Sequence, residues 1–88
     1  MRINKDYVLR NVAGESIVVP TGEAAQKLNG MMTLNETAAF LWENVEKVQT
    51  KEELVKLLLD EFDVDKEIAI EDVDDFINEL TAIGIIEN

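Results

Sequence analysis

Hydrophobic and β-branched residues form two short runs near the start of the chain. Tyr7–Val12 (YVLRNV) and Ser16–Pro20 (SIVVP) have the composition of strands. Residues 13–15 (AGE) separate them at the length of a short hairpin loop. The pattern therefore predicts two antiparallel strands. Pro20, with Thr-Gly behind it, ends the second, because proline cannot donate to a strand ladder.

An Asn-Gly pair at positions 29–30 precedes a third strand-like run, Met31–Leu34 (MMTL). Asn-Gly is typical of a type I′ turn, because both residues reach positive φ at low cost. The segment Ala24–Leu28 fits either a paired strand or a helical turn. Alternation divides the predicted third strand into two faces, Met32 with Leu34 and Met31 with Thr33.

The first helical pattern follows Asn35, which is a good N-cap. A capping box of Thr33 with Glu36 would start the helix two residues earlier. Phe40 lies off the main stripe, which favours a second packing surface over contact with a partner enzyme. The apolar stripe itself is Leu34, Ala38, Leu41, Trp42 and Val45.

Two further helices are predicted in the last forty residues. One begins at a capping box of Thr50 with Glu53. The other is capped by Asp65 and runs to about Ile83, with Gly84 where a left-handed C-cap is expected. The apolar faces are Leu54, Val55, Leu57, Leu58, Leu59 and Phe62 in one, and Ala69, Val73, Phe76, Ile77, Leu80 and Ile83 in the other.

Strands followed by helices indicate a single α+β domain over residues 1–88. We expect a winged helix-turn-helix-like fold, in which a small antiparallel sheet of three or four strands is followed by three helices. With 47% hydrophobic residues, such a chain buries about 60 to 65% of its unfolded surface. The sequence holds no long apolar span and no signal-peptide pattern, so we expect a soluble, cytoplasmic protein without membrane contact.

The net charge of −11 is unevenly placed. Residues 1–34 sum to +1, whereas residues 35–88 hold four lysines and sixteen acids. A surface of this sign repels the backbone of nucleic acids and anionic membranes. The third helix offers carboxylates where a DNA-recognition helix would offer Arg, Lys, Asn or Gln. These observations argue against a DNA-binding regulator, although the expected fold resembles one.

Candidate chemistry is sparse. The chain has no cysteine and no histidine, which excludes thiol nucleophiles, imidazole bases and most zinc or copper ligand sets. The segment DVDKEIAIEDVDD resembles a calcium loop, but Ile68 occupies the position that needs glycine. We therefore expect no catalytic residue, no metal site, no cofactor and no enzymatic activity.

The order and spacing of several blocks resemble the PqqD family across nearly the whole chain. The most specific block is LNETAAFLWE at Leu34–Glu43, preceded by IVVP and NGM and followed by TKEELV and DFINEL. The resemblance implies a non-catalytic module that recognises the leader part of a ribosomal precursor peptide. It presents that leader to a modifying enzyme, which is a radical SAM enzyme in the pathway to pyrroloquinoline quinone.

The resemblance also implies a site. The leader adds as an extra strand to the third strand, Met31–Leu34, and lies against one flank of the helix Asp65–Ile83. Within LNETAAFLWE, Leu41 and Trp42 would anchor that edge to the core. The residues expected to contact the peptide are Met31, Met32, Thr33, Leu34, Asp72, Phe76, Glu79 and Ile83.

Alternatives stay open at this point. A general protein interaction domain is the second interpretation, and an acidic winged-helix regulator is the third. Modules similar to PqqD also serve lasso peptides and lanthipeptides, so the resemblance does not specify pyrroloquinoline quinone as the product. An exposed edge at Met31–Leu34 could also pair with its own copy and give a homodimer.

Overall fold

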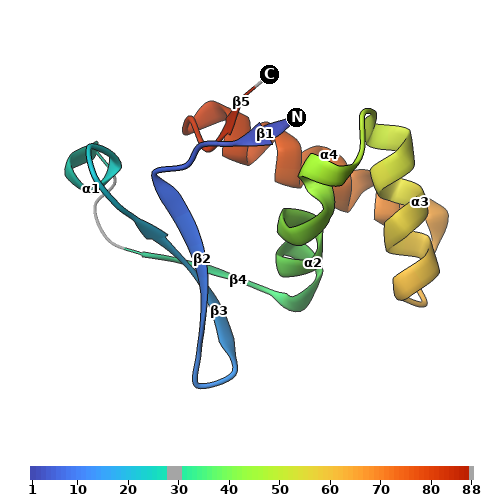
Figure 1. Cartoon of the computed structure of the whole chain (residues 1–88). Helices are drawn as coiled ribbons and strands as arrows, with labels where there is room; N and C mark the ends of the chain where they lie inside the picture. The colour runs from blue at the N-terminus through green and yellow to red at the C-terminus, as the bar shows by residue number, and fades with distance from the viewer. Residues whose placement is uncertain (28–30, 88) are drawn as a thin grey trace.

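A three-stranded antiparallel sheet forms one half of the molecule and a cluster of helices forms the other (Figure 1). The computed structural model describes residues 1–27 and 31–87. The sheet has the order β2–β3–β4. Its strands are β2 (Tyr7–Val12), β3 (Glu15–Pro20) and β4 (Met32–Leu34). All three were predicted, although β4 starts one residue later than expected.

The loop between β2 and β3 has two residues, not the three predicted. Glu15 pairs with Val12, so only Ala13 and Gly14 form the turn. Their φ angles are 52° and 83°. Two consecutive positive φ values define a type I′ turn, whose twist matches that of the strands, and this extends the ladder by one pair.

The ambiguous segment before β4 is helical. Helix α1 spans Ala24–Lys27, which settles the alternative between strand and helical turn for these four residues. Leu28 and the predicted Asn29-Gly30 turn lie outside the described residues. The three-stranded sheet is therefore not extended by a strand from Ala24–Lys27.

The helical half contains α2 (Glu36–Asn44), a 3₁₀ turn η1 (Val45–Lys47), α3 (Lys51–Glu61) and α4 (Lys66–Ala82). Asn35 is the N-cap of α2, because its Oδ1 accepts a 2.8 Å hydrogen bond from the Ala38 N–H. The alternative start at Thr33 is thus wrong. Asp65 occupies the N-cap position of α4, but its carboxylate accepts no hydrogen bond from the first turn of the helix. Gly84 takes the expected left-handed conformation, with φ of 83°.

The N-cap of α3 is Thr50, as predicted, but the carboxylate of Glu53 accepts from the Thr50 hydroxyl and not from the Thr50 N–H, so the reciprocal half of the predicted capping box is not formed. The Thr50 hydroxyl accepts from the Glu53 N–H at 3.2 Å and donates to Glu53 Oε1 at 3.3 Å. We expect Thr50→Ala to lower the free energy of unfolding by about 1 kcal/mol, because one N-terminal amide loses its acceptor. Urea unfolding measures this loss, and Thr50→Ser, which keeps the hydroxyl, is the matched control. Equal stability of all three proteins would show that water replaces the cap without cost.

A second, two-stranded sheet joins the two ends of the chain and was not predicted. Strand β1 (Arg2–Ile3) pairs antiparallel with β5 (Ile86–Glu87). The Asn4 N–H also donates to the Ile85 carbonyl at 2.7 Å. Figure 1 shows both termini side by side above the helices. Strands of two residues are too short to show alternation, so periodicity could not reveal them.

The hydrophobic core lies mainly among α2, α3 and α4 and extends to the sheet through Tyr7 and Val18. Leu41, Leu54 and Leu58 are almost completely buried, and Trp42 packs against the core with part of its ring exposed. Phe40 packs edge-on against Phe62, with ring centroids 5.4 Å apart and planes at 86°, in agreement with the predicted second packing surface. The α+β class is confirmed. Across the described segments, no helix is long and apolar enough to cross a membrane.

Candidate functional site: an open strand edge beside a groove

The hydrogen-bonding direction of β3 follows from one hydrogen bond just beyond its end. The Thr21 N–H donates to the Asp6 carbonyl at 2.6 Å, one step beyond the Tyr7–Pro20 pair that begins the ladder. Bonded and non-bonded pairs alternate along an antiparallel ladder. Ile17 therefore directs its main-chain groups towards β2. Ser16 and Val18 direct theirs the other way, towards β4.

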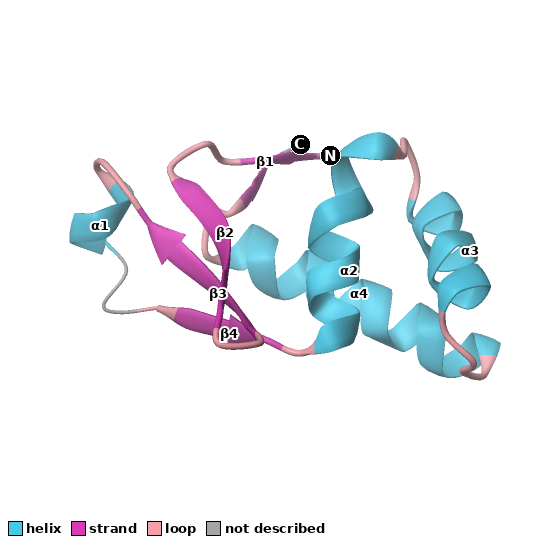
Figure 2. Ribbon diagram, turned by 60° about the horizontal axis from the view of Figure 1, so that its bottom comes forward, coloured by secondary structure: helices cyan, strands magenta, loops and turns pink. Residues whose placement is uncertain are grey.

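This alternation leaves Thr33 as the open residue of β4. Ser16 faces Leu34, Val18 faces Met32, and Ile17 faces Thr33. The first two pairs are the hydrogen-bonded ones, so the N–H and C=O of Thr33 point away from β3. Because β4 is an edge strand (Figure 2), these two groups are available to an incoming strand.

A groove of about 250 Å³ lies beside this edge, between β4, the first turns of α2 and one flank of α4. Its floor is apolar, with side chains of Leu34, Leu41 and Phe76 among others. Its α4 side carries three carboxylates at helical spacing. The complete lining is Met32, Leu34, Asn35, Thr37, Ala38, Leu41, Asp72, Asp75, Phe76, Glu79 and Leu80.

Five of the eight predicted site residues line this groove. They come from two elements that are far apart in the sequence: Met32 and Leu34 from β4, and Asp72, Phe76 and Glu79 from α4. Met32 and Leu34 are half-buried on the groove face, as the alternation predicted.

The other three predicted residues lie elsewhere. Met31 precedes β4 and is 67% exposed. The Thr33 side chain lines a different hollow, with Phe40 and Phe62, although its main chain faces the open edge. Ile83 lies beyond the last turn of α4 and lines a hollow with Tyr7 and Ala24. Its position at the C-cap directs it away from the groove.

Sequence reasoning missed the α2 wall of the groove. Asn35, Thr37 and Ala38 line it, because the N-terminus of α2 follows β4 directly and turns towards α4. Nothing in the spacing of these three residues indicates that α4 lies beside them. Asp75 was also missed, although its spacing of three from Asp72 places it on the same flank of the helix.

Among the side chains of residues 1–25 and 31–87, no cation is paired with the carboxylates of the groove. The ion pair found there joins Lys51 Nζ to Asp74 Oδ1 at 3.4 Å, outside the groove, with both side chains about half exposed. The same described part contains no cluster of three or more potential metal-ligating side chains. The groove therefore combines an apolar floor, a negative wall and free main-chain hydrogen-bonding groups.

Two solved structures share this fold. One is TbiB1 in complex with the TbiA(beta) leader peptide, with a TM-score of 0.76 and 20% identity, covering 100% of this chain and 96% of that one. The other is a lasso peptide synthetase B1 complexed with the leader peptide, with a TM-score of 0.76 and 15% identity, covering 99% and 96%. No curated protein matches the sequence.

The comparison with protein families gives a match over most of the sequence. The model described as coenzyme PQQ synthesis protein D (PqqD) matches residues 7–86. That range runs from the first residue of β2 to the first residue of β5, so it includes the open edge, α2 and α4. The chain belongs to the PqqD family.

Proposed function

We propose that this protein binds the leader part of a ribosomal precursor peptide and presents it to a modifying enzyme. The observation that carries the proposal is the free main chain of Thr33 beside the groove of β4 and α4. Family membership supports it. So does the likeness in fold to two proteins whose structures contain a leader peptide.

The leader would extend the sheet as a fourth strand next to β4. Its main chain would exchange hydrogen bonds with the N–H and C=O of Thr33, and alternate side chains would enter the groove. Each such bond contributes about 0.5 to 1.5 kcal/mol net. With two or three buried apolar side chains, less the cost of ordering the peptide, the affinity should be roughly micromolar. A complex of micromolar affinity is stable enough to form and dissociates readily enough to deliver the peptide to an enzyme.

The acidic wall favours a basic residue in the leader. Asp72, Asp75 and Glu79 lie along the side of the groove that faces the added strand. A Lys or Arg side chain there would pair with a carboxylate and fix the register of the peptide, and a cationic leader would associate faster at low salt. The eight residues predicted from the sequence, Met31 and Ile83 included, remain the contact set that binding experiments should examine.

The role we propose is delivery, not catalysis, by the single domain of residues 1–88. The recipient would be a peptide-modifying enzyme such as a radical SAM maturase, and the product could be pyrroloquinoline quinone or another modified peptide. Because the precursor is made by ribosomes, the protein would meet it in the cytoplasm.

A titration of ¹⁵N-labelled protein with the leader of the precursor peptide encoded beside its gene tests the proposal. We expect the largest amide shifts at Met32–Leu34 and along the flank of α4 that carries Asp72, Phe76 and Glu79. Shifts confined to other elements would move the site, and a folded protein whose spectrum does not change would refute leader binding.

A further inference from the structure

A second apolar hollow lies on the outer side of α3 and α4. It has a volume of about 340 Å³. Three aliphatic side chains, Val55, Leu59 and Ile70, form its apolar part, and charged side chains border it. We call this surface the α3–α4 patch; its residues are Glu52, Val55, Lys56, Leu59, Lys66 and Ile70.

Helical spacing places these residues together. On α3 they occur at intervals of three, four and seven from Glu52, and on α4 Lys66 and Ile70 are four apart, so each set forms one face. Ile70 is 41% exposed, which is unusual for a large aliphatic side chain on this domain. Together with Val55 and Leu59 it gives the hollow a contiguous apolar surface, and such a surface is typical of an interaction site.

The charged side chains of the patch, Lys56 and Lys66 against Glu52, sum to +1, whereas the C-terminal half of the chain is strongly negative. Residues 35–88 contain sixteen acids and four lysines, yet two of those lysines, Lys56 and Lys66, border this one hollow. Within the described ranges, neither forms an ion pair; the lysine that does is Lys51. A partner suited to this surface therefore has carboxylates next to apolar side chains.

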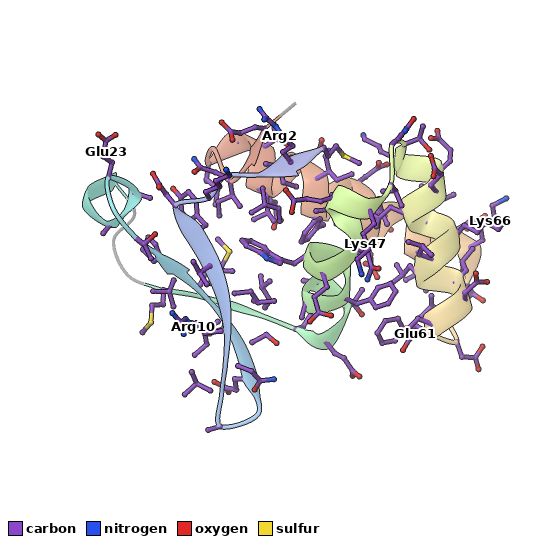
Figure 3. The ribbon with its side chains drawn as sticks, viewed as in Figure 1. Arg2, Arg10, Glu23, Lys47, Glu61 and Lys66 are labelled. Atoms are coloured by element: carbon purple, nitrogen blue, oxygen red, sulfur yellow. The ribbon has the colours of Figure 1, made fainter. Side chains whose placement is uncertain are left out.

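The patch and the leader groove use opposite flanks of α4. Ile70 and Glu79 are nine residues apart, which corresponds to a rotation of about 180° around the helix. In Figure 3, Lys66 projects outward beside α3, on the side of the molecule away from the sheet. A partner on the patch would thus leave the edge of β4 open.

We propose that the α3–α4 patch docks an amphipathic helix of the peptide-modifying enzyme. Aliphatic side chains of that helix enter the hollow between α3 and α4, and its flanking carboxylates pair with Lys56 and Lys66. This inference rests on the proposed function only in identifying the partner as the enzyme that receives the leader. Because the two sites share no residue, the leader and this helix can occupy the carrier at the same time.

A second copy of the chain fits the patch poorly. A two-fold contact would place two patches face to face, each with Lys56 and Lys66 against a single Glu52, so positive charge would be in excess on both sides. It would also join two molecules that each carry a charge of −11. A helix with acidic flanks has neither disadvantage.

Two synthetic amphipathic helices of identical composition and zero net charge test the proposal. Both carry a leucine stripe; in one, glutamates flank the stripe and lysines lie opposite, and in the other the two are exchanged. We expect the glutamate-flanked peptide to shift the methyl resonances of Val55, Leu59 and Ile70, with at least about tenfold higher affinity than its isomer. The double variant Lys56→Glu/Lys66→Glu should reverse that preference.

Several outcomes would overturn the proposal. These are equal binding of the two isomers, a preference unchanged in the double variant, or shifts that fall on the β4–α4 groove. Methyl shifts that depend on protein concentration without any peptide would instead assign the patch to a second copy. Leader affinity of the double variant is measured in parallel and should be unchanged. If even the wild-type protein fails to bind the leader, the proposed function fails while the peptide comparison still tests the patch.

Discussion

Replacing Thr33 by proline is expected to lower the affinity for the leader peptide by about tenfold to a hundredfold. Proline removes the outward N–H that an added strand would use as a donor. The facing carbonyl of the leader would then lose its partner, at a cost of about 1 to 3 kcal/mol, where each 1.4 kcal/mol is about tenfold in affinity. Isothermal titration calorimetry measures the change. The β3–β4 ladder should survive, because its bonds are made by Met32 and Leu34, not by Thr33.

The matched control is Asn11→Pro. Asn11 lies on β2, the opposite edge of the same sheet, and pairs with Ser16. Because bonded and non-bonded pairs alternate along the β2–β3 ladder, the N–H and C=O of Asn11 also point away from the sheet. Asn11→Pro therefore removes an outward N–H from an edge strand, as Thr33→Pro does. Leader binding should be retained in Asn11→Pro. Equal losses in the two variants would attribute the effect of Thr33→Pro to general damage of the sheet, and equal retention would place the leader elsewhere.

Leu58→Ala is expected to lower the free energy of unfolding by about 3 to 4 kcal/mol. The Leu58 side chain is completely buried in the core, on α3. Truncation removes its transfer free energy and leaves a cavity, which together cost about 2 to 5 kcal/mol in well-packed sites. A domain of this size has a total stability on the order of 5 to 10 kcal/mol. The variant should therefore retain only about 1 to 7 kcal/mol, and urea unfolding at 25 °C measures the difference.

Leu57→Ala is the control for this prediction. The same substitution one residue earlier removes a side chain that is only half-buried, so we expect a loss of about 1 kcal/mol. Similar losses at the two positions would mean that the core around α3 relaxes into the space vacated by Leu58.

Elements whose signals are local could be predicted from the sequence. The Asn35 cap, the Thr50 cap and the turn at Gly84 each depend on a few neighbouring residues, and the structure contains all three. The alternating faces of β4 are also local. For the same reason the two candidate starts of α2 could not be separated: Thr33 and Asn35 are both good caps, and only strand pairing with Ile17 commits Thr33 to β4.

Features that depend on distant contacts could not be predicted. The β1–β5 pairing joins segments more than eighty residues apart, and neither segment is long enough to show a period. The groove is similar: residues of β4 and α4 were expected together only through the family resemblance, and the contribution of α2 was missed. Ile83 lies outside the groove because its apolar character continues the α4 stripe in the sequence, whereas the helix ends at Ala82.

The pairing of β1 with β5 also affects how this domain can be combined with others. Arg2 and Glu87 are cross-strand partners, so the chain enters and leaves the domain at nearly the same point. Neither strand lines the groove or the α3–α4 patch. A domain whose ends meet can be inserted into a surface loop of another protein, or circularly permuted, with little disturbance of its interior. Because its two ends meet, the domain can be inserted as a recognition module into a larger engineered enzyme.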